Sequence, residues 1–117
     1  MDLFDTTQLA LGAALRGSSA RQAALSDNLA NVATPGYVRK DVDFHDTLAA
    51  AMDSGAGTKD LNFAPQNDTA APVRVDGNSV DVDAENSALA QNALEYDALA
   101  KVAGTRIDIL KSAMGVG

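Results

Sequence analysis

The sequence predicts a mainly α-helical protein, in which two long terminal helices pack as an antiparallel, coiled-coil-like pair joined by an extended or irregular middle segment. Two heptad-like apolar patterns, one in the first third of the chain and one in the last third, predict the helices. Glycines and prolines without an apolar period predict the irregular middle. We expect these parts to form one structural unit.

Residues 1–33 are predicted to form the first helix. A glycine and two serines at residues 17–19 leave a kink there as an alternative to a straight helix. The helix should end at about Val32 or Ala33, because the residue before Pro35 is disfavoured in the α region. Steps of four and three residues meet six large apolar side chains and three polar ones, at Phe4, Gln8, Leu11, Leu15, Ser18, Gln22, Leu25, Leu29 and Val32.

Residues 34–52 are predicted to hold the turn after this helix and the segment that follows, and residues 53–82 to be flexible or extended. The stretch 54–58 has the composition of a flexible linker. Valines alternate with polar residues over 73–82, so this part permits one short hairpin or two extended pieces.

Residues 83–117 are predicted to contain the second helix, over about 84–114. Asp81 or Asp83 is suited to cap its start, and Gly115 to end it. Three alanines in its apolar pattern would let a partner helix approach closely. The pattern is apolar throughout, at Leu89, Ala93, Tyr96, Ala100, Ala103, Ile107, Leu110 and Met114.

The composition indicates a thin hydrophobic core. Of the 117 residues, 46% are hydrophobic, but 23 are alanine, only 4% are aromatic and none is tryptophan. Large buried side chains supply most hydrophobic stabilisation, at ~25 cal/mol per Å² of apolar surface removed from water. Two helices and a loop leave the far side of each helix uncovered, so burial against copies or relatives of this chain is one solution. A self-contained helical hairpin is the other, and the composition does not choose between them.

The net charge of −7 argues against two classes of partner. Nucleic-acid binders and helices that dock on anionic lipid both need a basic face. The absence of cysteine removes disulfides, thiolate catalysis and cysteine metal sites. No run approaches the ~20 apolar residues that span a bilayer, and Asp2 and Asp5 stand where a secretory signal carries bases. We therefore expect a chain that stays in the cytosol or is exported without a cleaved signal.

The sequence contains no constellation typical of an enzyme. His45 is the only histidine, and the aspartates at 41, 43 and 46 beside it give zinc no closed ligand shell. The acidic stretch 76–83 lacks the glycine position and the ligand spacing of a calcium loop. Neither a phosphate-binding glycine motif nor a nucleophile elbow occurs. We therefore predict no catalytic residue, no cofactor and no metal.

One segment, residues 28–37, is more specific than the rest. Taken residue by residue, it is typical of a last helical turn followed by a Pro-Gly reversal. Its order closely resembles the N-terminal signature of the flagellar rod and hook family, Asn-[Ile/Leu]-Ala-Asn-x-x-Thr-Pro-Gly-[Tyr/Phe]. The matching residues are Asn28, Leu29, Ala30, Asn31, Thr34, Pro35, Gly36 and Tyr37.

The resemblance covers nearly the whole chain except roughly residues 53–72. Ser79 and Glu95 depart from the family pattern, and the change at Glu95 can alter a charge pair between subunits. The further stretches that resemble the short proximal rod proteins of this family are 41–44 with Leu48, 76–85, 92–96 and 110–114.

The resemblance implies a structural, non-catalytic subunit of the proximal flagellar rod, which self-assembles with other rod proteins into the periplasmic drive shaft. The implied partners are other rod proteins, the rod-to-membrane-ring adaptor, the MS ring and the export gate, with no nucleic acid and no direct membrane span. It also implies a place in the flagellar basal body and type III export without a cleaved signal peptide. The residues expected in the signature or at subunit interfaces are Leu11, Leu15, Leu25, Asn28, Leu29, Asn31, Thr34, Pro35, Gly36, Tyr37, Leu89, Tyr96, Ile107 and Leu110.

Two alternatives remain at this point. Another short rod protein of the family shares the signature but usually carries a longer insertion before the tyrosine, which this sequence lacks. A small helical binding module or export chaperone would be stably helical as a monomer or closed dimer. A rod subunit should instead have partly disordered termini until it assembles. Circular dichroism with sedimentation on the isolated chain would separate these last two classes.

Overall fold

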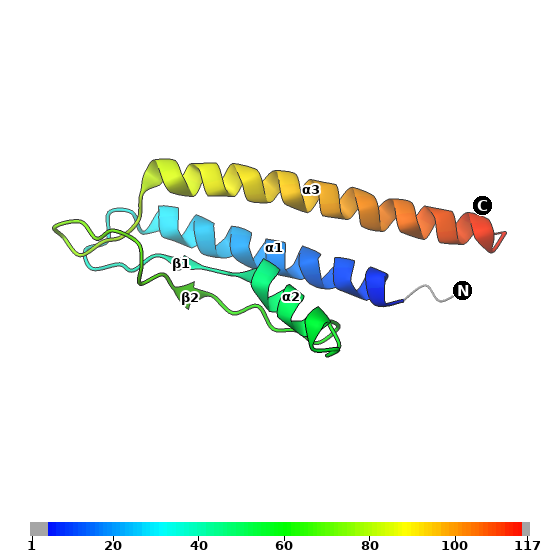
Figure 1. Ribbon diagram of the computed structural model, residues 1–117. Coiled ribbons are helices and arrows are strands. Elements are labelled where there is room, and N and C mark those ends of the chain that lie inside the picture. The colour runs from blue at the N-terminus through cyan, green and yellow to red at the C-terminus, as the bar shows by residue number, and fades with distance from the viewer. Residues whose placement is uncertain (1–4, 116–117) are drawn as a thin grey trace.

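The computed structural model describes residues 5–115, and it consists mainly of two long helices. α1 (Thr6–Ala30) and α3 (Val82–Ala113) run antiparallel and lie side by side (Figure 1). The molecule is therefore elongated, with extents of 62 × 30 × 15 Å. The predicted fold class, an antiparallel pair of long helices with an irregular middle, is confirmed. We call the end where α1 finishes and α3 begins the closed end of the hairpin, and the opposite end the open end.

Aspartate side chains cap the starts of both long helices. Asp5 accepts a hydrogen bond from the backbone N–H of Gln8 at 2.8 Å. Asp81, one of the two predicted caps, accepts from the N–H groups of Asp83 and Ala84 at 3.0 and 3.2 Å. Each cap satisfies N–H groups that have no partner within the helix.

α1 is helical without interruption through residues 17–19, where the sequence left a kink open. It ends at Ala30, and the predicted end at Val32 or Ala33 falls in the turn that follows. Phe4, the first position of the predicted apolar pattern, lies outside the described residues.

The three polar residues that interrupt the apolar pattern of α1 all find partners on α3. Arg106 Nε donates to Gln8 Oε1 at 3.2 Å. Asn92 Nδ2 donates to Gln22 Oε1 and to the backbone oxygen of Ser18, both at 2.8 Å. Because Ser18 and Asn92 are buried, a shift of one helix along the other would leave their polar groups unpaired. These contacts therefore set the register of the hairpin.

The face of α3 that meets α1 coincides only in part with the predicted apolar pattern. Ala103 and Leu110 of that pattern are buried, but Tyr96 and Ile107 remain 41% and 38% exposed. The polar Asn92, which lies outside the pattern, is buried instead. The polar groups of α1 thus turn α3 so that part of its apolar stripe faces solvent.

A short helix, α2 (Phe44–Asp53), packs against α1 and was not predicted (Figure 1). Asp43 caps it by accepting from the N–H of Asp46 at 3.5 Å. Phe44, Leu48 and Ala51 recur at helical spacing, and all three are buried or half-buried. Ten residues rarely hold a helix without tertiary packing, so α2 depends on burying this face.

The main hydrophobic cluster lies between α1, α2 and the strand beside them, and Leu99 of α3 packs against it. β1 (Lys40–Asp41) pairs antiparallel with β2 (Gln66–Asn67), which ties the middle segment to this side of α1. Phe44, only 1% exposed, is the largest buried side chain. The core residues are Ala14, Ala24, Val42 and Phe44, with Ala20, Leu48, Phe63 and Leu99 packed against them.

Gly17→Ala is expected to destabilise the protein. A Cβ at residue 17 would lie 2.4 Å from the Cβ of Phe44, so α1 and α2 would have to move apart. Overpacking of this kind costs about 1–3 kcal/mol. Urea unfolding followed by circular dichroism measures the loss.

Gly12→Ala is the matched control on the same helix. The nearest atom to a Cβ at residue 12 is 4.0 Å away. This variant should gain up to ~1 kcal/mol from helix propensity. Equal stabilities of the two variants would contradict the close packing of Phe44 on α1.

Candidate functional site

At the closed end, the signature residues that follow α1 meet the segment that precedes α3. These stretches, residues 28–37 and 76–85, are the two that most strongly suggested a family resemblance. They are joined by hydrogen bonds from side chain to backbone and from backbone to backbone. We call this arrangement the clasp, because it fastens the end of one long helix to the start of the other.

Asn78 is the centre of the clasp. Its side chain is fully buried, and Nδ2 donates to the backbone oxygens of Asn31, Val32 and Thr34 at 2.9, 3.1 and 2.8 Å. Carbonyls after the last turn of a helix have no partner within that helix. Asn78 therefore supplies from a distant segment the donors that the end of α1 lacks.

Arg74 adds a second set of donors at the same place. Its guanidinium donates to the backbone oxygens of Val32 and Val80, both at 2.6 Å. One side chain thus joins the turn after α1 to the segment that leads into α3. The side chain of Asp76 is its nearest acidic partner, at 3.7 Å.

Two glycines let the two segments approach each other. Gly36 and Gly77 have φ angles of 76° and 85°, a backbone region that favours glycine. A Cβ on Gly77 would lie 3.2 Å from the Cα of Gly36. The N–H of Gly36 donates to the backbone oxygen of Asp76 at 2.9 Å. Gly36 of the signature therefore forms the turn after α1 and also packs against Gly77.

Asn28 links the last turn of α1 to the chain that returns beside it. Its Oδ1 accepts from the N–H of Lys40 at 2.9 Å, and its Nδ2 donates to the Lys40 oxygen at 2.7 Å. Nδ2 also lies 3.2 Å from Oε2 of Glu85, and the Tyr37 hydroxyl donates to Oδ1 at 3.3 Å. Burial and the negative charges of Asp27 and Glu85 raise the pKa of Tyr37, which keeps this hydroxyl a donor.

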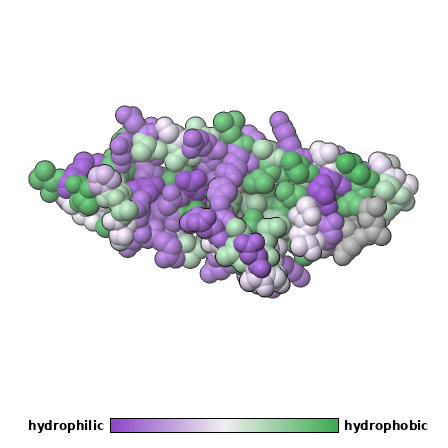
Figure 2. Space-filling view, viewed as in Figure 1, coloured by the Kyte–Doolittle hydropathy of each residue, from purple (hydrophilic) through white to green (hydrophobic). Residues whose placement is uncertain are grey.

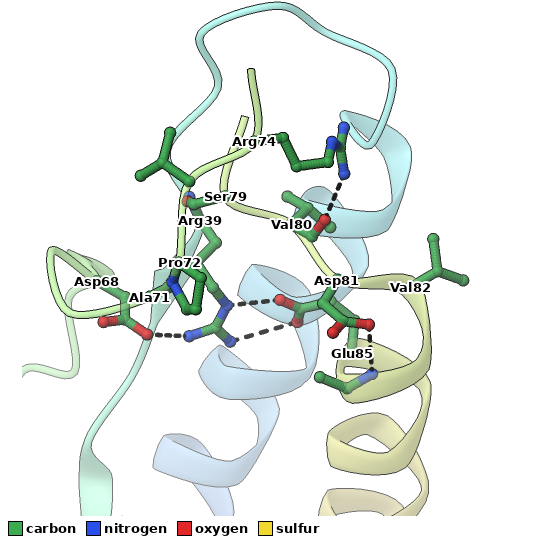
Figure 3. Close-up of a pocket in the computed structure, with 12 residues that line it drawn as sticks. Arg39, Asp68, Ala71, Pro72, Arg74, Ser79, Val80, Asp81, Val82 and Glu85 are labelled. Carbon is green, nitrogen blue, oxygen red and sulfur yellow. Dashed lines mark hydrogen bonds and ion pairs between the residues drawn. The ribbon is translucent and has the colours of Figure 1, made fainter. Parts of the chain in front are cut away.

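Arg39 and Glu85 form a buried ion pair under the clasp. Glu85 is 1% exposed, and its carboxylate receives Arg39 Nε at 2.5 Å. Figure 3 shows the Arg39 guanidinium lying between Glu85 on α3 and Asp68 in the middle segment, which it reaches at 2.5 Å. The hydrogen bond to Glu85, more than any other contact, raises the pKa of Arg39 above its ordinary value.

Asp41 connects the same network to α1. Arg21 Nε donates to its carboxylate at 2.8 Å. Partial burial acts to raise the pKa of Asp41, but hydrogen bonds from Arg21 and from the N–H of Val42, with the charge of Arg39, outweigh it and lower the pKa. Asp41 is therefore held as a carboxylate between two guanidinium groups.

The structure separates the predicted site residues into two groups. The polar signature residues and Tyr37 gather at the clasp, whereas the apolar residues are distributed along the two long helices. Of the latter, Leu25 and Leu110 are buried inside the hairpin, Tyr96 and Ile107 are exposed, and the remaining residues, Leu11, Leu15, Leu29 and Leu89, are half-buried.

Sequence reasoning missed Arg39, Arg74 and the partners of Asn78. The stretch 76–85 was singled out by its order, but nothing in that order indicates which carbonyls Asn78 would reach. No signal in the sequence pairs Arg39 with Glu85, because the two residues are 46 positions apart in the chain.

The other side chains that could take part in catalysis or metal binding do not gather at one place in the described part of the chain. His45, near the start of α2, bonds Glu95 of α3. This places Glu95, which departs from the family pattern, in a contact within one chain. Over residues 5–115 no group of His, Cys, Asp or Glu is arranged to hold a metal ion. The helices of that same range are also too polar for any of them to cross a lipid bilayer.

The described part of the chain is thus a hairpin of long helices, fastened by a polar clasp, with several large apolar side chains of α3 left exposed. Comparison with known proteins gives the family. No family model matches the chain. It is 34% identical to the flagellar basal body rod protein FlgB of Aeromonas hydrophila, over 86% of each chain.

Two further relatives carry the same name. The chain is 30% identical to FlgB of Bacillus subtilis, over 100% of this chain and 99% of the relative, and 31% identical to FlgB of Yersinia enterocolitica, over 89% and 90%. The chain therefore belongs to the FlgB family of flagellar basal body rod proteins.

Asn78→Ala should loosen the clasp. It would remove the Nδ2 donor from the oxygens of Asn31, Val32 and Thr34, of which Val32 keeps Arg74, and would leave the buried N–H of Val80 without the Asn78 Oδ1 acceptor. Each unsatisfied buried polar group costs about 1–3 kcal/mol. Urea unfolding should show a loss in this range. Asn62→Ala, at an exposed position of the middle segment, is the control, and an equal loss there would exclude a special role for Asn78.

Asp41 should make the stability depend on acid pH. Because its pKa is lower in the folded chain, its contribution is fully present above the ordinary value of about 4 and is lost as the pH falls through the folded value. The free energy of unfolding should therefore fall as the pH is lowered below about 5. Asp41→Asn and Arg21→Gln should both reduce this fall in urea titrations, and an unchanged pH dependence in both would contradict the assignment.

Proposed function

We propose that this chain is a structural, non-catalytic subunit of the proximal rod of the flagellar basal body, where it self-assembles with other rod proteins. Family membership supports a rod component, and the outer face of α3 supports assembly. The clasp joins the four predicted regions, 1–33, 34–52, 53–82 and 83–117, so we propose that they act in the rod as one structural unit.

The observation that carries the proposal is the apolar surface left uncovered on α3. Figure 2 shows apolar surface gathered over the half of the molecule nearer the open end, while the half nearer the closed end is more hydrophilic. Burying one large apolar side chain contributes ~1.5–3 kcal/mol. The residues concerned on α3 are Leu94, Tyr96, Val102, Ile107, Ile109 and Met114, which are 71%, 41%, 50%, 38%, 62% and 47% exposed.

The predicted interface residues fit this surface. Tyr96 and Ile107 lie in the outward part of the apolar stripe, and the small Ala93 and Ala100 between and beside them would let a neighbouring helix come close. A stripe of this kind, on a helix whose register is already set by polar contacts, is suited to helix-on-helix packing between subunits.

We further propose the neighbours and the location implied by the family. They are other rod proteins, the rod-to-membrane-ring adaptor, the MS ring and the export gate, with export through the flagellar type III apparatus and no cleaved signal peptide. The net charge of −7 is consistent with protein neighbours and not with nucleic acid.

Ile107→Asp tests the proposal. A carboxylate at this half-covered position would be desolvated at the interface between subunits, while the isolated chain, where residue 107 is 38% exposed, should keep its fold. We expect motility to be lost and the chain to be missing from purified basal bodies. Ile107→Ala should weaken assembly less, because it removes only apolar contact.

His45→Ala is the control, because His45 is exposed and its contact with Glu95 lies within the chain. Motility should be retained. Normal motility with Ile107→Asp would count against the proposed assembly surface. A closed dimer in solution that is missing from purified basal bodies would instead favour a helical binding module.

A further inference from the structure

A groove opens at the closed end between the middle segment and the start of α3. One wall is made by Ala71, Pro72 and Val73, and the other by Val80, Val82 and Ala84. Arg39 and Glu85 also line it, and they are bonded to each other (Figure 3). We call it the valine groove.

The walls of the valine groove are held in place without any partner. Arg74, beside Val73, donates to the Val80 oxygen at 2.6 Å and so fastens one wall to the other. Asp68, at the start of the first wall, is bonded to Arg39 at 2.5 Å. A groove that is already ordered has little conformational entropy to lose when it is occupied.

The walls present apolar side chains to solvent. Val73 is 65% exposed and Val82 is 44% exposed, although Val80 between them in the groove is buried. Val75, on the adjoining turn, is fully exposed. The backbone of this turn is fixed by hydrogen bonds from the N–H of Arg74 to the Asn78 oxygen and from the N–H of Gly77 to the Arg74 oxygen, both at 2.9 Å. Exposed valines on a fixed backbone are typical of a contact surface.

The rim of the groove is acidic. Asp81 lines the groove, Asp76 lies beside the lining Arg74, and Asp83 stands between the lining residues Val82 and Ala84. All three acids are exposed, and Arg74 is the only basic residue from Val73 to Asp83. Arg74 is already occupied by two backbone oxygens and by Asp76. The surface therefore favours a partner that brings positive charge, because like charges opposite this rim would repel.

We propose that the valine groove docks an apolar side chain carried on a basic segment of a different, neighbouring protein of the rod assembly. This inference rests on the proposed function. It assigns the closed end a partner of its own, distinct from the helices that cover the apolar face of α3.

Recovery of the chain in purified basal bodies tests the groove. Val73→Asp and Val82→Asp add charge at exposed wall positions, and residue 82 begins α3, where an acid suits the helix dipole. Both should lower recovery at least tenfold while circular dichroism of the isolated chain stays unchanged. Val38→Asp, at a valine 38% exposed outside the groove, should assemble normally. Normal recovery of the two groove variants, or equal loss in all three, would overturn the proposal.

A matched pair of variants tests the charge of the rim. Asp83 and Asp46 are exposed acids in the first turns of α3 and α2. Asp83→Lys should lower recovery and Asp46→Lys should not, although both lose the same helix-dipole contact. Equal recovery of the two variants would overturn the charge requirement.

A photoreactive benzoylphenylalanine at residue 82 identifies the occupant in assembled basal bodies. A cross-linked peptide with net positive charge from another protein supports the proposal. A peptide from a second copy of this chain, an acidic peptide, or no cross-link overturns it. If the unaltered chain is itself absent from basal bodies, the proposed function fails. If it is present while the groove variants assemble normally, only the docking proposal fails.

Discussion

The structure depends on one buried carboxylate. Glu85, at the first turn of α3, is almost inaccessible to water and is held by Arg39 and Asn28. Through these two residues it joins the last turn of α1, the returning strand and, by way of Asp68, the middle segment. Breaking a buried ion pair by removing one partner typically costs about 3–5 kcal/mol. A chain with few large apolar side chains therefore gains its defined closed end from charge and hydrogen bonding.

Many polar side chains are bonded inside the fold, while several large apolar side chains of α3 are left exposed. All five arginines are engaged within the described part of the fold, as are the polar residues that interrupt the apolar pattern of α1. Polar contacts specify a register because a shifted pairing leaves buried groups unsatisfied. The large apolar side chains of α3 that stay exposed include Leu94, Val102, Ile107 and Ile109. This arrangement suits a subunit that must hold its shape while its helices are completed by other chains.

Much of the architecture could be predicted from the chain. The two long helices, the Asp81 cap and the absence of a regular structure through most of the middle follow from local rules of periodicity and capping. α2 was not predicted, because its ten residues are stabilised by the packing of Phe44 on Gly17, and these two positions are 27 residues apart. The contacts of Gln8, Ser18 and Gln22 were not predicted either, because in the sequence these residues only interrupt the apolar pattern. Their partners, Arg106 and Asn92, lie opposite them only in the folded chain.

By itself, the sequence determined the helices, the turn at Pro35-Gly36 and the family, because each depends on neighbouring residues or on their order. Only the tertiary structure decided which groups the motifs bond. Asn78 caps α1 from 44 to 47 positions away, and Arg39 reaches Glu85 across 46. The tertiary structure also decided that the apolar stripe of α3 faces partly outward, because the rotation of a helix about its axis is set by the side chains that oppose it. Which side chains oppose it depends on tertiary packing, and a local sequence pattern does not contain that information.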